Sequence, residues 1–245
     1  MNRRSHQCQC SASCQRPSLK GEAFCAKHMK EGCPRSAPLS GWEPKYEPWR
    51  WNDRNEVRLT HNCFSYAFNI VDPEQIKACL QHPSCDVPFH QPGSISGHPK
   101  FNDKDPKSCP NMIIRLLGDN MNILPSSFEE RCPNGMSKIA LISDEDEDYH
   151  FLVQNGPNGP NGTNGPKAPK ETQGYFSQKS GSLPVTDKDA EGHKIFDVKL
   201  ANHNFKKNSL NYDRFCGYFC IPRDRQLFAK VGGSKRARVT RRRRK

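Results

Sequence analysis

Twelve cysteines restrict the possible folds of this 245-residue chain more than any other property of its sequence. Their distribution is uneven, because six possible metal ligands fall within the first 33 residues: Cys8, Cys10, Cys14, Cys25, His28 and Cys33. The N-terminus lacks the apolar core of a signal peptide, and no window reaches the roughly 18 apolar residues of a membrane-spanning helix. We therefore expect a reducing compartment, in which thiols stay free, bind metal or take part in chemistry.

Two ligand pairs in this region have the spacing of a metal site. They predict a structural zinc ion bound by Cys10, Cys14, Cys25 and His28. Sulfur and imidazole ligands suit tetrahedral zinc, and the metal would fold residues 1–35, which are too few to be stabilised by burial alone. Either Cys8 or Cys33 could replace one of the four ligands. Disulfides, or an unstructured cysteine-rich leader, are the alternatives.

The formal net charge of +12 is concentrated at the C-terminus. Nine Lys and Arg residues lie between 230 and 245 and no acid follows Asp224, so residues 1–229 carry only 12 − 9 = +3. The segment 226–245 is predicted to be a disordered tail that nucleic acid or a nuclear import receptor could bind. The residues expected to make these contacts are Lys235, Arg236, Arg238, Arg241, Arg242, Arg243, Arg244 and Lys245. A solubilising tail is the alternative.

The rest of the chain reads as helices followed by strands. Residues 36–60 combine prolines with three tryptophans and are predicted to be an extended strap on a neighbouring surface. Apolar spacing predicts a helix that begins at Cys63 and ends before Pro73, and a second one over 110–117. Strands are predicted at 138–143, 149–154, 175–178 and 215–221, with a low-complexity Asn-Gly-Pro insertion at 155–173. This order predicts an α+β domain over 61–225, with helices packed on an antiparallel sheet.

Cys63 is the candidate nucleophile. At the first turn of a helix, unpaired N–H groups and the helix dipole would stabilise its thiolate and lower its pKa. His150, on the second predicted strand, is expected to face that helix and take the thiol proton, and Gln178 on the next strand is expected to orient the imidazole. A small buried cysteine and a solvated histidine are the alternatives.

Two supporting features surround this pair. The backbone N–H of Cys63, with the side chain of Asn62 or His61, would form an oxyanion hole, although an N-cap role explains Asn62 equally well. Five consecutive acidic residues, 144–148, precede His150 and are expected to raise the pKa of its imidazole.

Five segments carry a resemblance to a known family: HNCFSYAFN, QPG, KIALISDEDEDYHFLVQ, GYFSQKSGSLPVTDKDAEG and NYDRFCGYFCIP. They resemble papain-like cysteine hydrolases of the NlpC and CHAP type, and more closely an uncharacterised papain-like group of large DNA viruses and some microbes. The resemblance covers roughly residues 40–222. It implies a papain-like fold and a peptidase or amidase that forms an acyl-enzyme on Cys63, with His150 as the base.

One departure from the group leaves a second function open. The third strand of the group often reads WSHKPG, whereas FSQKSG places Gln178 where a histidine would orient the base. The alternative is therefore a catalytically weak or inactive papain-like scaffold, serving as a virion or nucleic-acid-associated structural protein. The expected location is a virion, or the nucleus or cytoplasm of a host cell.

Overall fold

The computed structural model describes residues 7–102, 105–156, 174–205 and 210–223. Within them, helices precede an antiparallel sheet, so the α+β class predicted from the sequence is confirmed. Most of the predicted insertion at 155–173 and all of the predicted tail at 226–245 lie outside the described residues.

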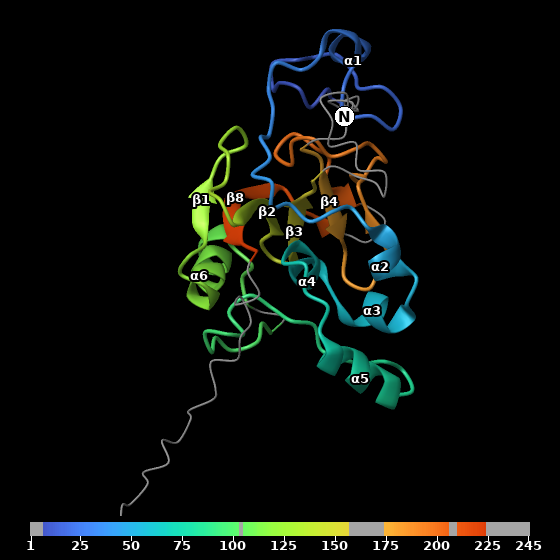
Figure 1. The fold of residues 1–245 in the computed structure, drawn as a ribbon, viewed down its shortest axis with the longest axis vertical. Helices are drawn as coiled ribbons and strands as arrows, with labels where there is room; N and C mark the ends of the chain where they lie inside the picture. The colour runs from blue at the N-terminus through green and yellow to red at the C-terminus, as the bar shows by residue number, and fades with distance from the viewer. Residues whose placement is uncertain (1–6, 103–104, 157–173, 206–209, 224–245) are drawn as a thin grey trace, which may run out of the picture.

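A six-stranded antiparallel sheet forms the centre of the molecule (Figure 1). In spatial order its strands are β1 (Leu124–Ser126), β8 (Arg214–Pro222), β2 (Met136–Asp144), β3 (Asp148–Gln154), β4 (Phe176–Lys179) and β5 (Val185–Thr186). Two further short strands, β6 (Asn204–Phe205) and β7 (Leu210–Asn211), pair with each other. The four strands predicted from apolar patterning are the four central ones. Strands β2, β3 and β4 are buried for most of their length, and β8 is buried over residues 218–221.

In the part of the chain that the structure describes, six short helices precede the sheet. They are α1 (Ala26–Glu31), α2 (Pro48–Asn52), α3 (Asn55–Thr60), α4 (Cys63–Ala67), α5 (Pro73–Gln81) and α6 (Cys109–Asp119). The helix predicted from Cys63 is α4, and it is shorter than expected because Asn69 adopts a left-handed φ of 58° just after it. The helix predicted over 110–117 is α6, with its proline in the first turn.

The segment 36–60 differs from the prediction. It was expected to be extended throughout, but it contains α2 and α3. Pro48 is tolerated because it lies at the start of α2, where its missing N–H would have no helical partner. Trp51 and Val57 are buried in the main core, so tertiary packing outweighs the helix-breaking composition of this segment.

The sheet separates two main cores, one on each face, and a third, small cluster is formed by Cys132, Met136 and Cys220. Alternate residues of a strand point to opposite faces, and on β3 Tyr149, Phe151 and Val153 join the core that contains Cys63 and α4. Leu152 joins the other core. Figure 1 shows α4 lying against β3 and β4, with α2, α3 and α5 toward the same end of the molecule.

The second face is covered by a loop, 187–203, and by the N-terminal module, residues 7–35. The side chain of Gln9 fastens the module to the loop: its Nε2 donates to Lys194 O at 3.0 Å, and its Oε1 accepts from the backbone N–H groups of Phe196 and Asp197. Figure 1 shows the module at the end of the molecule opposite α5.

Four disulfides join segments that are distant in the sequence or close a local turn. They are Cys10–Cys33, Cys79–Cys85, Cys109–Cys216 and Cys132–Cys220. The expectation of free or metal-bound thiols is therefore wrong for eight of the twelve cysteines, because the fold brings their sulfur atoms together in pairs. The cysteines left free are Cys8, Cys14, Cys25 and Cys63.

A candidate metal centre and the predicted catalytic residues

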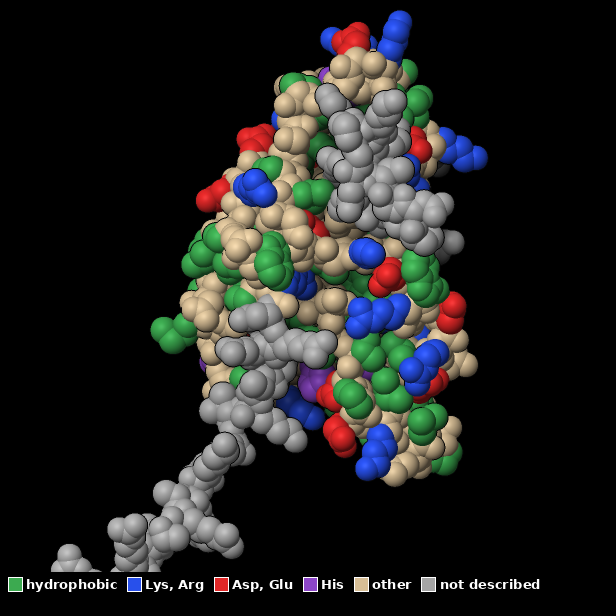
Figure 2. Space-filling model, in the orientation of Figure 1, with side chains coloured by type: hydrophobic (Ala, Val, Ile, Leu, Met, Phe, Trp, Pro, Cys, Tyr) green, Lys and Arg blue, Asp and Glu red, His purple; other side chains and the backbone are tan. Residues whose placement is uncertain are grey.

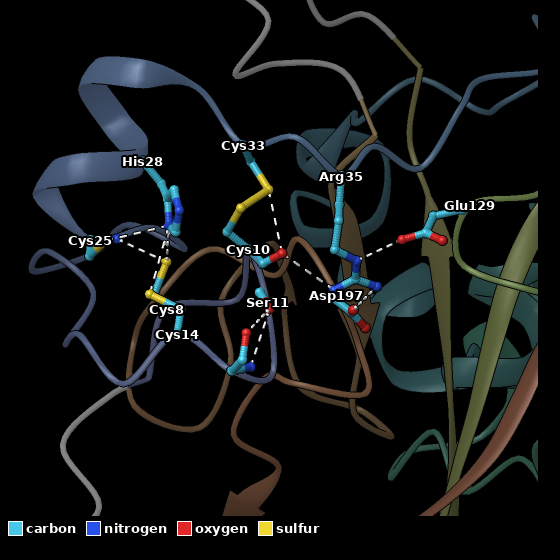
Figure 3. Close-up of a disulfide and its surroundings, with 11 residues drawn as sticks. Cys8, Cys10, Ser11, Cys14, Cys25, His28, Cys33, Arg35, Glu129 and Asp197 are labelled. Atoms are coloured by element: carbon cyan, nitrogen blue, oxygen red, sulfur yellow. Dashed lines mark hydrogen bonds and ion pairs between the residues drawn. A yellow bond between two sulfur atoms is a disulfide. The ribbon is translucent and has the colours of Figure 1, made fainter.

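Four side chains of the N-terminal module converge on one point. The Sγ atoms of Cys8, Cys14 and Cys25 and a ring nitrogen of His28 all lie within 4.8 Å of one another. His28 Nδ1 is 3.1 Å from the sulfur of Cys8, 3.5 Å from that of Cys25 and 3.8 Å from that of Cys14 (Figure 3). The four atoms form a compact group of soft ligands that could hold a metal ion.

The local backbone explains this convergence. Cys25 is the N-cap of α1, and His28 follows within the first turn, so both project from the start of one helix. The backbone N–H of Cys25 donates to the sulfur of Cys8 at 3.3 Å, which joins the helix to the preceding loop. In that loop the N–H of Cys14 donates to Ser11 O at 3.0 Å, which turns the chain back toward α1.

The pKa values of the Cys8 and Cys25 thiols are shifted in opposite directions. Burial raises the pKa of the Cys8 thiol to about 11, although the N–H of Cys25 opposes the shift. The pKa of Cys25 is lowered: burial acts to raise it, but hydrogen bonds from the backbone N–H of His28 and from neighbouring thiols outweigh burial. Cys25 therefore forms the thiolate, the form that binds metal, more readily than Cys8 does.

Cys10, predicted as a ligand, is not in this group. It forms a disulfide with Cys33, and Cys8 takes its place (Figure 3). Cys8 and Cys10 are two residues apart, and the spacing to Cys14 does not say which of the two faces α1. The three other predicted ligands, Cys14, Cys25 and His28, are all members of the group.

Arg35, which no sequence pattern singles out, connects the N-terminal module to the sheet and its loops. Its guanidinium lies 2.7 Å from Glu129 Oε1 and 2.9 Å from Asp197 Oδ2, and it stacks over the ring of Phe128. Asp197 is almost fully buried, so loss of Arg35 would leave its carboxylate without its ion-pair partner. Figure 3 shows the ion pair between Arg35 and Asp197 beside the Cys10–Cys33 disulfide. The metal group and this ion pair therefore lie in one small region.

Cys63 begins α4 as predicted, but its thiol is not poised for attack. Only 5% of the residue is exposed, and its Sγ is 4.0 Å from the carbonyl oxygen of Tyr149. Burial, helped by the negative charge of Asp148, raises the pKa of the thiol to about 12. Cys63 is thus a protonated thiol near neutral pH, the opposite of the predicted thiolate, because a helix of five residues does not offset its burial.

His150 lies on the other face of the sheet. Its ring stacks on Tyr212, a member of the second core, whereas its neighbours on β3, Tyr149 and Phe151, pack with Cys63 in the first. The strand therefore separates the imidazole from the thiol, and the predicted Cys63–His150 pair is wrong.

The pKa of His150 also moves against the prediction. Burial first, and then the nearby His203, lower it to about 3, so the ring is neutral. The acidic residues 144–148 were expected to raise this pKa. They do not, because β3 carries His150 into the interior, and the nearest of them, Asp148, accepts a hydrogen bond from Tyr212.

Gln178 lies where it was expected relative to the imidazole. Its Oε1 is 2.8 Å from His150 Nε2, and its amide nitrogen donates to Lys188 O. An amide oxygen only accepts, so Nε2 carries the ring proton. Asn62 is an N-cap, since its Oδ1 accepts from the N–H of Ser65 at 3.2 Å while its amide donates to His90 O.

His61, the other oxyanion candidate, is fully buried and engaged at both ring nitrogens. Its Nδ1 is 2.9 Å from Val57 O, and its Nε2 accepts from the N–H of Asp72.

The predicted nucleic-acid contacts between Lys235 and Lys245 lie outside the described residues. Among the described residues, no helix is both long and apolar enough to cross a membrane. No family model, curated protein or solved structure was found to match the chain.

Proposed function

We propose that this chain is a non-catalytic scaffold, braced by zinc and disulfides, whose basic C-terminal tail binds nucleic acid. The observation that carries the proposal is the position of Cys63 and His150 on opposite faces of β3. A thiol hydrolase needs these two groups within hydrogen-bond reach. Asn62 and Gln178, the polar side chains expected to assist them, are engaged in hydrogen bonds within the fold.

Zinc is the metal that we assign to the group of Cys8, Cys14, Cys25 and His28. Tetrahedral zinc with bonds of about 2.3 Å to sulfur and about 2.0 Å to nitrogen places the nitrogen about 3.5 Å from each sulfur. The nitrogen-to-sulfur distances of 3.1, 3.5 and 3.8 Å bracket that value. Four protein ligands leave no open position for substrate, so the ion would be structural.

The charge distribution favours the tail as the nucleic-acid contact. On the face drawn in Figure 2, basic and acidic side chains of the described residues are intermixed rather than sorted into one patch. Residues 1–229 carry +3, whereas 230–245 carry nine positive charges. A dense positive segment displaces counterions from phosphates, which drives binding with little sequence preference.

The four disulfides indicate the kind of compartment in which such a scaffold is found. Disulfides persist in oxidising surroundings, such as the outside of a cell or the surface of a virion, and are rare in a reducing cytoplasm. We therefore infer a particle or an oxidising compartment in preference to the nucleus or cytoplasm.

The proposal is tested by nucleic-acid binding with the full chain and with a chain ending at residue 229. We expect the full chain to bind duplex DNA or RNA of unrelated sequences equally well, with log K falling by about 0.9 per phosphate contact for each unit of log salt. The truncated chain should lose most of this affinity. A matched control replaces Arg241, Arg242, Arg243 and Arg244 with glutamine, which keeps the length and removes four charges. Equal binding by all three chains would contradict the proposal.

A further inference from the structure

A polar cavity of about 370 Å³ lies on the second face of the sheet, and its lining includes neither Cys63 nor any of the four residues of the metal group. One wall comes from the N-terminal module, with Gln7 and Ser18, and another from the loop around Asp189 and His203. Tyr212 and its neighbours at the start of β8 complete the wall. The volume is at the lower end of the range for small-molecule sites, roughly 300–1,000 Å³.

The walls of this cavity are held in place before any ligand arrives. Asp189 accepts the N–H groups of Glu191 and His193 on one carboxylate oxygen and that of Asn202 on the other. Tyr212 donates its hydroxyl to Asp148 at 2.9 Å, so its ring is fixed. A preformed site binds at a lower entropic cost than one that must be ordered.

His203 supplies a buried acceptor with no donor. Its Nε2 lies 2.7 Å from Val198 O, and because a carbonyl oxygen only accepts, the ring proton is on Nε2. That leaves a lone pair on Nδ1, which has no hydrogen-bond partner in the described structure. The residue is 8% exposed, and burial lowers its pKa, so protonation does not satisfy this atom. His203 is one of the residues that line the cavity, so this unsatisfied acceptor lies in the cavity wall, and a ligand that donates a hydrogen bond there would satisfy it.

The charged groups in the lining favour the same kind of ligand. Three carboxylates face one ammonium, because Asp189, Glu191 and Asp213 line the cavity together with Lys199. Asp213 also has a 3.7 Å contact with the exposed Arg214. Asparagine side chains at 202, 204 and 211 also line the cavity, and each carries both an acceptor oxygen and an amide donor.

We propose that this cavity binds a guanidinium or alkylammonium group. Such a cation donates several hydrogen bonds, has no acceptor, and is attracted by carboxylates that an anion would avoid. The group could belong to a basic residue of a peptide or to a free small amine, and both would present the same chemistry to the lining. Because Gln7 and Ser18 line the cavity, the ligand would touch both the module and the body.

The test uses the full chain, labelled with ¹⁵N, and three probes. These are acetyl-Gly-Arg-Gly-amide, its neutral citrulline analogue, and agmatine, a free guanidinium amine. We expect the arginine peptide, agmatine or both to shift amide resonances within 189–204 and 210–215. The citrulline peptide should bind at least about ten-fold more weakly, since it lacks the charge. Binding of the peptide alone would assign the site to a basic residue within a chain, and binding of agmatine alone to a free amine.

Matched variants separate the cavity from general charge effects. Asp213→Asn should weaken binding about two- to five-fold, the usual worth of an exposed ion pair. Asp86→Asn removes a similarly exposed carboxylate that does not line the cavity, and it should leave the affinity unchanged. Equal binding of the arginine and citrulline peptides would overturn the proposal. So would an absence of shifts at millimolar probe, or shifts confined to residues outside the cavity.

Discussion

At the scale of single residues, burial decides what Cys63 and His150 can do. Both were selected because their local sequence suits catalysis, and both are nearly inaccessible to solvent. Desolvation penalises a charged form, so it raises the pKa of the thiol to about 12 and lowers that of the imidazole to about 3. Each residue is neutral near neutral pH, and each contributes to a core.

The thiol of Cys63 is therefore expected to react slowly with alkylating agents. In native protein near pH 7.5, iodoacetamide should label Cys63 at the rate of global unfolding, and a denaturant should accelerate labelling sharply. Peptide mass spectrometry after timed quenching measures this rate. His150→Ala serves as the comparison, because it should change the labelling rate only as far as it changes stability. Rapid labelling of Cys63 in the folded protein, slowed by His150→Ala, would instead support a catalytic pair.

His150 gives folding stability a pH dependence whose sign follows from its lowered pKa. The unfolded chain binds a proton near pH 6.5, whereas the folded chain binds it only near pH 3. The contribution of this residue is therefore fully present above pH 6.5 and is lost as pH falls, by up to about 1.4 kcal/mol per pH unit. Urea unfolding at pH 7.5, 6.5 and 5.5 measures the slope, and His150→Gln should make it shallower. An unchanged slope in that variant would show that His150 does not titrate in this way.

At the scale of elements, sequence reasoning found the parts with strong local patterns. The starts of α4 and α6 and the four central strands carry apolar repeats and caps that predict them directly. Strand β1, Leu124–Ser126, has the sequence LPS and exists because it pairs with β8, which no local pattern indicates. Similarly, alternation on β3 places Tyr149 and His150 on different faces, but it does not tell which face α4 covers. The predicted Cys63–His150 dyad is wrong because it required α4 to cover the face of the sheet on which His150 lies.

The disulfides close loops of very different length, so removing each of them should lower the free energy of unfolding by a different amount. Cys109–Cys216 joins α6 to β8 across 107 residues, whereas Cys79–Cys85 closes a turn of six. Constraint of the unfolded chain predicts about 4.7 kcal/mol for a loop near 100 residues and about 2 kcal/mol for the short one. Denaturant unfolding of the two double-serine variants measures the difference. A larger loss for the Cys79–Cys85 variant would show that native packing, rather than chain entropy, sets these values.

At the scale of the whole molecule, the N-terminal module and the sheet depend on each other. The module has few apolar residues of its own, yet Phe24 packs against Phe196 in the second core. Gln9 and Arg35 complete the attachment through hydrogen bonds and an ion pair. A metal ion that folds the module would therefore also protect one face of the sheet.

Removal of the metal should expose that face while it spares the other. We expect chelation of the full chain to increase hydrogen exchange in the loop 187–203, because the side chain of Gln9 joins the module to that loop. Little change is expected in α4, which packs in the core on the opposite face of the sheet. Cys8→Ser should abolish stoichiometric zinc binding and reproduce the effect of chelation. The matched control, Cys10→Ser with Cys33→Ser, removes the neighbouring disulfide and should retain one zinc ion per chain. Zinc loss in the control but not in Cys8→Ser would restore Cys10 as the ligand, and equal exchange with and without metal would mean that the module docks without it.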